Sequence, residues 1–166
     1  GEHVIFSNSG SQQVIFNNSP SRYWTIDGID MTGGINGCRL SGSSAAAHHH
    51  ISFLNCIMRS MNPGIPIEAS GASDIEVLTC TLRDSGSNGF EHGIYAARYS
   101  QRWLVKFCTI YNISGYGLHF YDDTVLPIDC KLLSNHTYSC GSAGVIAYGS
   151  GHLIANGISR LNGTNG

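Results

Sequence analysis

The sequence predicts an all-β fold in which short strands wind into about six stacked coils, forming a β-solenoid. Two series of similar phrases interleave along the 166 residues and share one variable period. Each period holds two or three short runs rich in Ile, Val, Leu, Phe and Tyr, separated by Gly, Ser, Asn and Asp. Repeats of this length without amphipathic helical stretches are typical of coils that stack on one another.

The first series consists of short strands that begin with glycine. They start at Gly37, Gly64, Gly93, Gly117 and Gly144, with spacings of 27, 29, 24 and 27 residues. Side chains alternate between the two faces of a strand. One face then carries Cys38, Ile65, Ile94, Leu118 and Val145, followed two residues later by Leu40, Ile67, Ala96, Phe120 and Ala147. Because all ten are apolar, we expect this face to form the interior, with the first five side chains in one buried file.

The second series carries a cysteine in each repeat. Its members are Cys56, Cys80, Cys108 and Cys130, spaced by 24, 28 and 22 residues. We expect these four to form an inward column of small apolar side chains, because a free cysteine packs as a small hydrophobe. Zinc sites use C-x-x-C spacing, and the sequence contains none. The remaining two cysteines lie off the column, and the count of six leaves the redox compartment open.

Composition limits the classes of partner. The net charge of −2 provides no basic surface for a phosphate backbone, which argues against nucleic acid as a partner. No apolar run approaches the roughly 20 residues that a membrane helix needs, so we expect no membrane span. A hydrophobic content of 42% is typical of a globular chain, and we expect one domain over residues 1–166. Both ends stop within strand-like sequence, which suggests a segment of a longer chain.

Several phrases resemble the repeats of one known superfamily. They are "YWTIDGIDMTGG", "HHHISFLNCIMRS", "SDIEVLTCTLRDSG", "HGIYAARY" and "ISGYGLHFY". They are similar to the repeats of the right-handed parallel β-helix superfamily of pectate-lyase-like proteins, and the resemblance covers nearly the whole chain. It implies a secreted protein that holds a polysaccharide along the outside of a parallel sheet. The superfamily includes lyases, hydrolases, epimerases, tailspikes and adhesins, so the resemblance alone does not select an activity.

The outward positions of the glycine-led strands gather aromatic and polar side chains. We expect Tyr95 and His119 to lie above one another on neighbouring coils there. Aromatic rings stack on the apolar faces of sugars, while polar groups hydrogen-bond the hydroxyls. The expected substrate-binding residues of this surface are Glu68, His92, Tyr116, Tyr148 and Arg39.

A polysaccharide lyase that cleaves an acidic polysaccharide by β-elimination is the first functional hypothesis. His119 would act as the base, Tyr95 or Tyr121 as the proton donor, and Arg98 or Arg39 would neutralise the carboxylate. Asp122 and Asp123, with Glu68, could instead hold Ca²⁺ through hard oxygen ligands. The superfamily's lyases more often use Lys or Arg as the base, and no Lys occupies an outward position of the glycine-led strands.

Two alternatives remain open. Hydrolysis requires carboxylates a fixed distance apart, and "YDD" at residues 121–123 resembles the paired aspartates of polygalacturonase-like hydrolases only slightly. The same "YDD" is also ordinary turn sequence after a strand, and the histidines can simply pack with tyrosines. The second hypothesis is therefore a non-catalytic glycan-binding or structural solenoid, similar to an adhesin or tailspike. Such a solenoid could associate with copies of itself through the strand edges at its ends.

Overall fold

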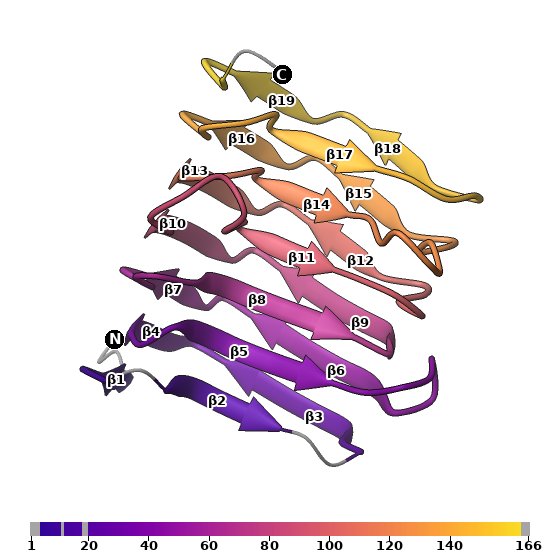
Figure 1. The fold of residues 1–166 in the computed structure, drawn as a ribbon, viewed down its shortest axis with the longest axis horizontal. Helices are drawn as coiled ribbons and strands as arrows, with labels where there is room; N and C mark the ends of the chain where they lie inside the picture. Colours follow the sequence, from indigo (N-terminus) through magenta and orange to yellow (C-terminus); the bar gives the residue numbers. More distant parts are fainter. Residues whose placement is uncertain (1–3, 11, 18–19, 164–166) are drawn as a thin grey trace.

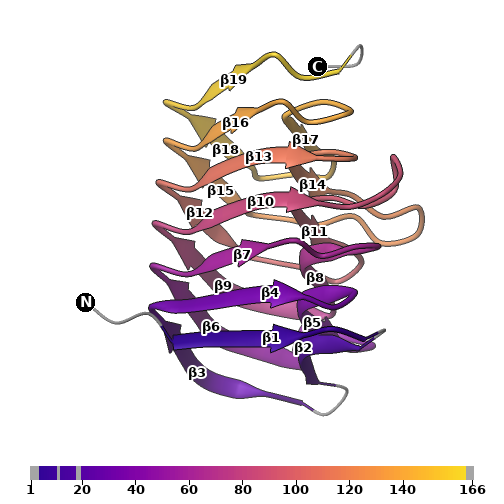
Figure 2. The same cartoon turned by 90° about the vertical axis from the view of Figure 1, so that its left-hand side faces the viewer.

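The computed structural model describes residues 4–10, 12–17 and 20–163, and these residues form nineteen strands and no helix. The strands assemble into three parallel sheets of seven, six and six strands (Figures 1 and 2). Each strand pairs with strands of neighbouring coils rather than with its neighbour in sequence. The chain therefore winds through the three sheets in turn for about six coils, which confirms the predicted parallel β-solenoid.

We call the three sheets A, B and C. Sheet A contains β1 (Val4–Asn8), β4 (Ile29–Gly33), β7 (Ile57–Arg59), β10 (Thr81–Ser85), β13 (Thr109–Ile113), β16 (His136–Tyr138) and β19 (Ile158–Arg160). Sheet B contains β2 (Gln13–Asn17), β5 (Asn36–Ser41), β8 (Ile65–Ser70), β11 (Ile94–Ala96), β14 (Leu118–Phe120) and β17 (Val145–Ala147). Sheet C contains β3 (Arg22–Asp27), β6 (His48–Leu54), β9 (Ala72–Leu78), β12 (Leu104–Lys106), β15 (Lys131–Leu133) and β18 (Leu153–Ala155).

The interior is the apolar face that alternation predicts. Eight of the ten predicted inward residues of sheet B are buried. The other two, Val145 and Ala147, are half-buried and pack against the core. They belong to β17, the last strand of sheet B among the described residues, so no further described strand covers them. The outward positions are thus free of any role in the core.

Glycine recurs because successive coils approach closely where sheet B begins. A Cβ atom on Gly93 would lie 2.4 Å from the carbonyl oxygen of Gly117. A Cβ atom on Gly117 would lie 2.5 Å from the carbonyl oxygen of Gly144. Real Cβ atoms do not come this close to backbone, so only glycine fits at these corners. The sequence signal of the glycine-led strands therefore reflects a steric requirement.

The predicted register is wrong in one coil. Ile65 pairs with Asn36, whereas Ile67 pairs with both Cys38 and Ile94 and so occupies the buried file. Gly64 does not match the other corner glycines; a Cβ atom there would meet the carbonyl oxygen of Ile35 instead. In register, strand β8 therefore begins two residues earlier than β11 and at the same level as β5. A shift of two preserves the inward and outward faces, so only the partners change.

The cysteine column is confirmed for three of its four predicted members. Cys56, Cys80 and Cys108 are buried and immediately precede β7, β10 and β13, at the corner between sheets C and A. Cys130 instead precedes β15, at the corner where sheet C begins. Asn135 takes the fourth place in the column and accepts a hydrogen bond from the backbone N–H of Cys108 at 3.0 Å. Cys130 was assigned to the column because it follows Cys108 by 22 residues, but it lies at another corner.

All six cysteines are free and buried. Burial raises the pKa of the Cys38 thiol to about 12. Burial also raises the pKa of Cys130 and of Cys140 to about 11. A side-chain hydrogen bond with Cys80 lowers the pKa of Cys108, but this thiol is buried too, and all six serve as packing groups.

The two end coils expose apolar side chains. Val4 and Ile5 on β1 are 53% and 57% exposed, and Ile154 and Ile158 near the other end are 54% and 58% exposed. Association of copies through these ends stays a prediction. No helix long and apolar enough to cross a membrane occurs in the residues that the structure describes.

Candidate functional site

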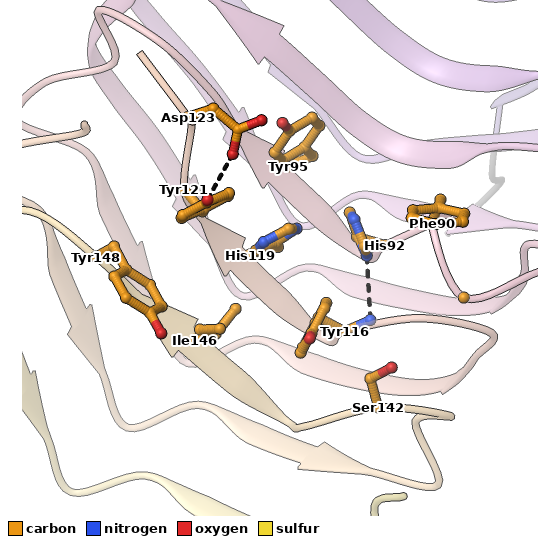
Figure 3. A pocket seen from close by; sticks show the side chains of 11 residues that line it. Phe90, His92, Tyr95, Tyr116, His119, Tyr121, Asp123, Ser142, Ile146 and Tyr148 are labelled. Carbon is orange, nitrogen blue, oxygen red and sulfur yellow. Dashed lines mark hydrogen bonds between the residues drawn. The ribbon is translucent and has the colours of Figure 1, made fainter. Parts of the chain in front are cut away.

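A groove of about 620 Å³ lies on the outer face of sheet B. Strands β11, β14 and β17 supply its floor, and the loop over residues 86–93 borders it (Figures 1 and 3). Its lining consists of Gly89, Phe90, His92, Tyr95, Tyr116, His119, Tyr121, Asp123, Ser142, Ile146 and Tyr148. The groove coincides with the predicted aromatic surface.

His119 lies at the centre of an aromatic cluster (Figure 3). It pairs in register with Tyr95 of the preceding coil, and the two rings stack at 5.0 Å with an angle of 20°. Tyr121 stacks on the same ring at 5.7 Å and 5°, and His92 meets it edge-on at 4.2 Å. The predicted stacking of Tyr95 and His119 on neighbouring coils is confirmed. The rings pack on one another, so the imidazole of His119 is held in one orientation.

Both histidines of the groove are neutral at physiological pH. Burial lowers the pKa of His119 to about 4. Burial, together with the charge that His119 would carry, lowers the pKa of His92 to about 3. Nδ1 of His92 accepts a hydrogen bond from the backbone N–H of Tyr116 at 3.1 Å, which leaves the proton on Nε2. The groove therefore offers imidazoles as neutral hydrogen-bonding groups and not as cations.

The phenols of Tyr95 and Tyr121 stay protonated. The hydroxyl of Tyr121 donates a hydrogen bond to Asp123 at 2.5 Å, and this bond raises the pKa of Tyr121. Burial, followed by the charges of Asp122 and Asp123, raises the pKa of Tyr95. Asp123 is the one charged residue that lines the groove. The polar chemistry of the site is thus hydrogen bonding by neutral groups around a single carboxylate.

Asp122 does not fit the predicted calcium site. One of its carboxylate oxygens accepts hydrogen bonds from Thr124 N at 2.8 Å, Thr124 Oγ1 at 2.6 Å and Val125 N at 3.3 Å. The other oxygen accepts from Nε of Arg98 at 3.3 Å. Burial acts to raise its pKa, but these hydrogen bonds and the charge of Arg98 outweigh burial and lower the pKa to about 2. Asp122 is therefore the turn-forming residue of the "YDD" sequence.

Calcium takes six to eight oxygen ligands from carboxylates, carbonyl groups and water. Among the described residues, no group of three or more His, Cys, Asp or Glu side chains converges as a metal site requires. Asp123 is engaged by Tyr121, and Asp122 is engaged by its own turn. We therefore derive no chemical step through calcium.

The predicted site residues divide into three groups. His92, Tyr95, Tyr116, His119, Tyr121, Asp123 and Tyr148 come together in the groove. Arg98 and Asp122 line an adjacent cavity of about 460 Å³ that shares Tyr95 with the groove. Arg39 and Glu68 line neither cavity; they form an ion pair at 3.4 Å, and Asn36 also donates to Glu68 at 2.5 Å.

A family model described as a right-handed β-helix region matches residues 2–159 of the chain. The chain belongs to the right-handed β-helix family. This match agrees with the parallel sheets and with the coil-by-coil register. Comparison with curated proteins gives no match, and comparison with solved structures gives none either. The family match establishes the fold of this β-helix. Its function is inferred from the groove.

Sequence reasoning missed Phe90, which is 86% exposed at the edge of the groove. Its loop is held in shape by Glu91, whose carboxylate accepts hydrogen bonds from the backbone and the side chain of Asn88. The side chain of Asn88 in turn accepts from the backbone N–H of Phe90 at 2.8 Å. Phe90 is the one aromatic residue of the polar run "DSGSNGFEHG", and this is the sequence signal that could have identified it as a binding residue. Alternation also places Ile146 outward, in register with His119, whereas Ser142 carries no comparable signal.

Proposed function

We propose that this β-helix binds a carbohydrate chain in the groove on sheet B. The observation that carries the proposal is a fixed aromatic cluster with an exposed ring toward each end. Tyr148 is 52% exposed and Phe90 is 86% exposed, and they lie on opposite sides of His119 in Figure 3. Large exposed aromatic side chains that gather on one face of a protein mark a binding surface.

The chemistry of the groove suits sugars. Exposed aromatic rings offer flat apolar surfaces to the C–H faces of a pyranose ring, and phenols combine such a surface with a polar tip. The hydroxyls of Tyr95 and Tyr121, Nε2 of His92 and the carboxylate of Asp123 supply hydrogen-bond donors and acceptors. An open groove that mixes apolar walls with a few placed polar groups suits a chain that passes along the surface.

Binding is better supported than cleavage by β-elimination. That reaction needs a base and a cation that neutralises the uronate carboxylate. The low pKa of about 4 makes His119 a weak base, and no Arg or Lys is among the residues that line the groove. Arg98 and Arg39 both lie outside the groove, away from His119. We therefore propose a binding module, with polysaccharide as its partner and a location outside the cell as expected from the sequence.

Hydrolysis has less support than either alternative. A glycoside hydrolase places two carboxyl groups on opposite sides of the scissile bond. The groove contains one, Asp123, and it is hydrogen-bonded to Tyr121. Asp122 does not line the groove, and its carboxylate is held by Thr124, Val125 and Arg98.

The test is titration calorimetry with cellohexaose, xylohexaose, hexagalacturonate and a chondroitin sulfate hexasaccharide. We expect at least one of them to bind, and we expect Tyr121→Ala to weaken that binding. Tyr111→Ala is the matched control, because Tyr111 stacks on Tyr138 at 4.8 Å on sheet A, away from the groove. Absence of binding across the panel contradicts the proposal. Release of unsaturated uronate, detected by its ultraviolet absorbance, would establish the lyase instead.

A further inference from the structure

We infer that the cavity beside the groove receives an anionic group of the bound glycan, a carboxylate or a sulfate ester, and that Arg98 recognises it. This inference rests on the proposed function and specifies its ligand class. The cavity is lined by Gly42, Ser43, Ser70, Tyr95, Ala97, Arg98, Tyr99 and Asp122. Tyr95 lines both this cavity and the aromatic groove, so one chain can occupy both.

Small side chains create the cavity at the carboxyl ends of the early sheet B strands. Ser41 pairs with Ser70, the last residue of β8, and Ala97 follows β11 directly. In the later coils Tyr121 and Tyr148 follow β14 and β17 directly. Along the same edge of sheet B, bulky rings therefore build the groove and small residues leave the neighbouring space open.

Arg98 presents unused donors to this space. Its Nε donates to Asp122 at 3.3 Å, and the described residues provide no other hydrogen-bond acceptor for the guanidinium. The side chain is 51% exposed. The carboxylate of Asp122 is also held by Thr124 and Val125, so the turn fixes the position of Asp122 independently of Arg98. The two terminal amino groups of Arg98 are thus left for a ligand.

The geometry of a guanidinium selects the ligand class. Two parallel N–H groups match the oxygens of a carboxylate or a sulfate in a bidentate contact. The ionised Asp122 offsets part of the positive charge, so the contact depends on direct hydrogen bonds and not on long-range attraction. Ser43 adds a hydroxyl that can donate to the same anion, whereas the hydroxyl of Ser70 donates to the carbonyl oxygen of Gly42 at 3.1 Å. Arg39 differs because its partner Glu68 holds it outside both cavities.

The experiment compares matched probes that differ in charge. One pair is hexagalacturonate and its methyl ester, and the other is a chondroitin sulfate hexasaccharide and its desulfated form. We expect the protein to bind the charged member of at least one pair about five- to tenfold more tightly. The first pair reports a carboxylate and the second a sulfate ester. Arg98→Gln removes this preference and Arg98→Lys keeps part of it. Arg102→Gln leaves it unchanged, because Arg102 is 50% exposed and paired with Asp74 on sheet C.

The outcomes separate this inference from the proposed function. Equal affinity for both members of both pairs overturns the inference and leaves glycan binding intact. A preference that survives in Arg98→Gln also overturns it. Absence of binding to every probe and to the neutral oligosaccharides refutes the proposed function and this inference together. Thermal unfolding of Arg98→Gln at the same temperature as the parent protein shows that any loss reflects recognition and not misfolding.

Discussion

The rings of Tyr95 and His119 stack at 5.0 Å on successive coils of the β-helix. Their neighbours in the chain, Ile94 and Leu118, pair in the same register and are fully buried. The similar phrases "HGIYAARY" and "GYGLHFYDD" thus repeat for two reasons. The inward positions must fill the core of each coil, whereas the outward positions build a cluster that the core does not require.

Tyr148 should contribute to glycan affinity through its exposed ring. We expect Tyr148→Ala to weaken binding about fivefold, ~1 kcal/mol, because the substitution removes an exposed stacking surface. Phe107→Ala is the control, since Phe107 is 55% exposed but lies at a corner away from the groove, beneath Lys106. Calorimetric titration measures both variants. An equal loss in the two variants would show that the groove is not the binding surface.

The two histidines of the groove should destabilise the protein as pH falls. Their pKa values in the folded state, about 3 for His92 and about 4 for His119, lie below the usual value of 6.5. The unfolded chain therefore binds more protons between pH 6.5 and about 3 to 4. The free energy of unfolding is expected to decrease as pH falls through this window and to be insensitive to these groups above it. Urea denaturation at a series of pH values measures this dependence.

Proton NMR provides the direct check on these two residues. The imidazole signals of His92 and His119 should not titrate between pH 8 and 5, because both rings stay neutral there. A midpoint near 6.5 for either ring would show that its burial does not control its protonation.

Replacing Gly117 even with alanine should destabilise the fold. The new methyl group would lie 2.5 Å from the carbonyl oxygen of Gly144, and backbone cannot move aside as a flexible side chain can. We expect Gly117→Ala to lower the free energy of unfolding by about 1–3 kcal/mol. Gly89→Ala, where no atom lies within 4 Å of the added carbon, should change it by less than about 0.5 kcal/mol. Urea denaturation measures both variants. A similar change in the free energy of unfolding for the two would contradict the steric requirement for glycine at this corner.

The six thiols should be unreactive in the folded protein. All are buried, and burial holds the pKa of Cys38 at about 12. Because the thiolate is the reactive form, Ellman's reagent should titrate none of them at pH 8 and all six in denaturant. Rapid reaction of one thiol under native conditions would show that its coil opens.

The fold was predictable because the chain repeats a steric and apolar pattern in every coil. Gly93 and Gly117 marked the corners, and inward apolar positions marked the core. The register of β8 was not predictable from the glycines. Pro66, and not Gly64, lies beside Gly37 at the corner, so Gly64 is two residues out of step with the other glycines. Spacing alone cannot distinguish a shift of two residues, which keeps every side chain on its original face.

The groove was predictable in part for the same reason. Alternation identified Tyr95 and His119 as outward neighbours, and the structure stacks them. The pairing of Arg39 with Glu68 depends on a contact between coils that no local pattern reports. Phe90 reaches the groove from a loop, where neither alternation nor the repeat assigns a direction.

The central claim is that the aromatic groove on sheet B is the surface that a glycan contacts. The most direct measurement is NMR titration of ring protons with the oligosaccharide that binds most tightly. We expect the signals of Phe90, Tyr121 and Tyr148 to shift with ligand concentration, and those of Tyr111 and Tyr138 on sheet A to stay unchanged. Shifts confined to the sheet A pair, or absent from all five rings, would contradict the claim.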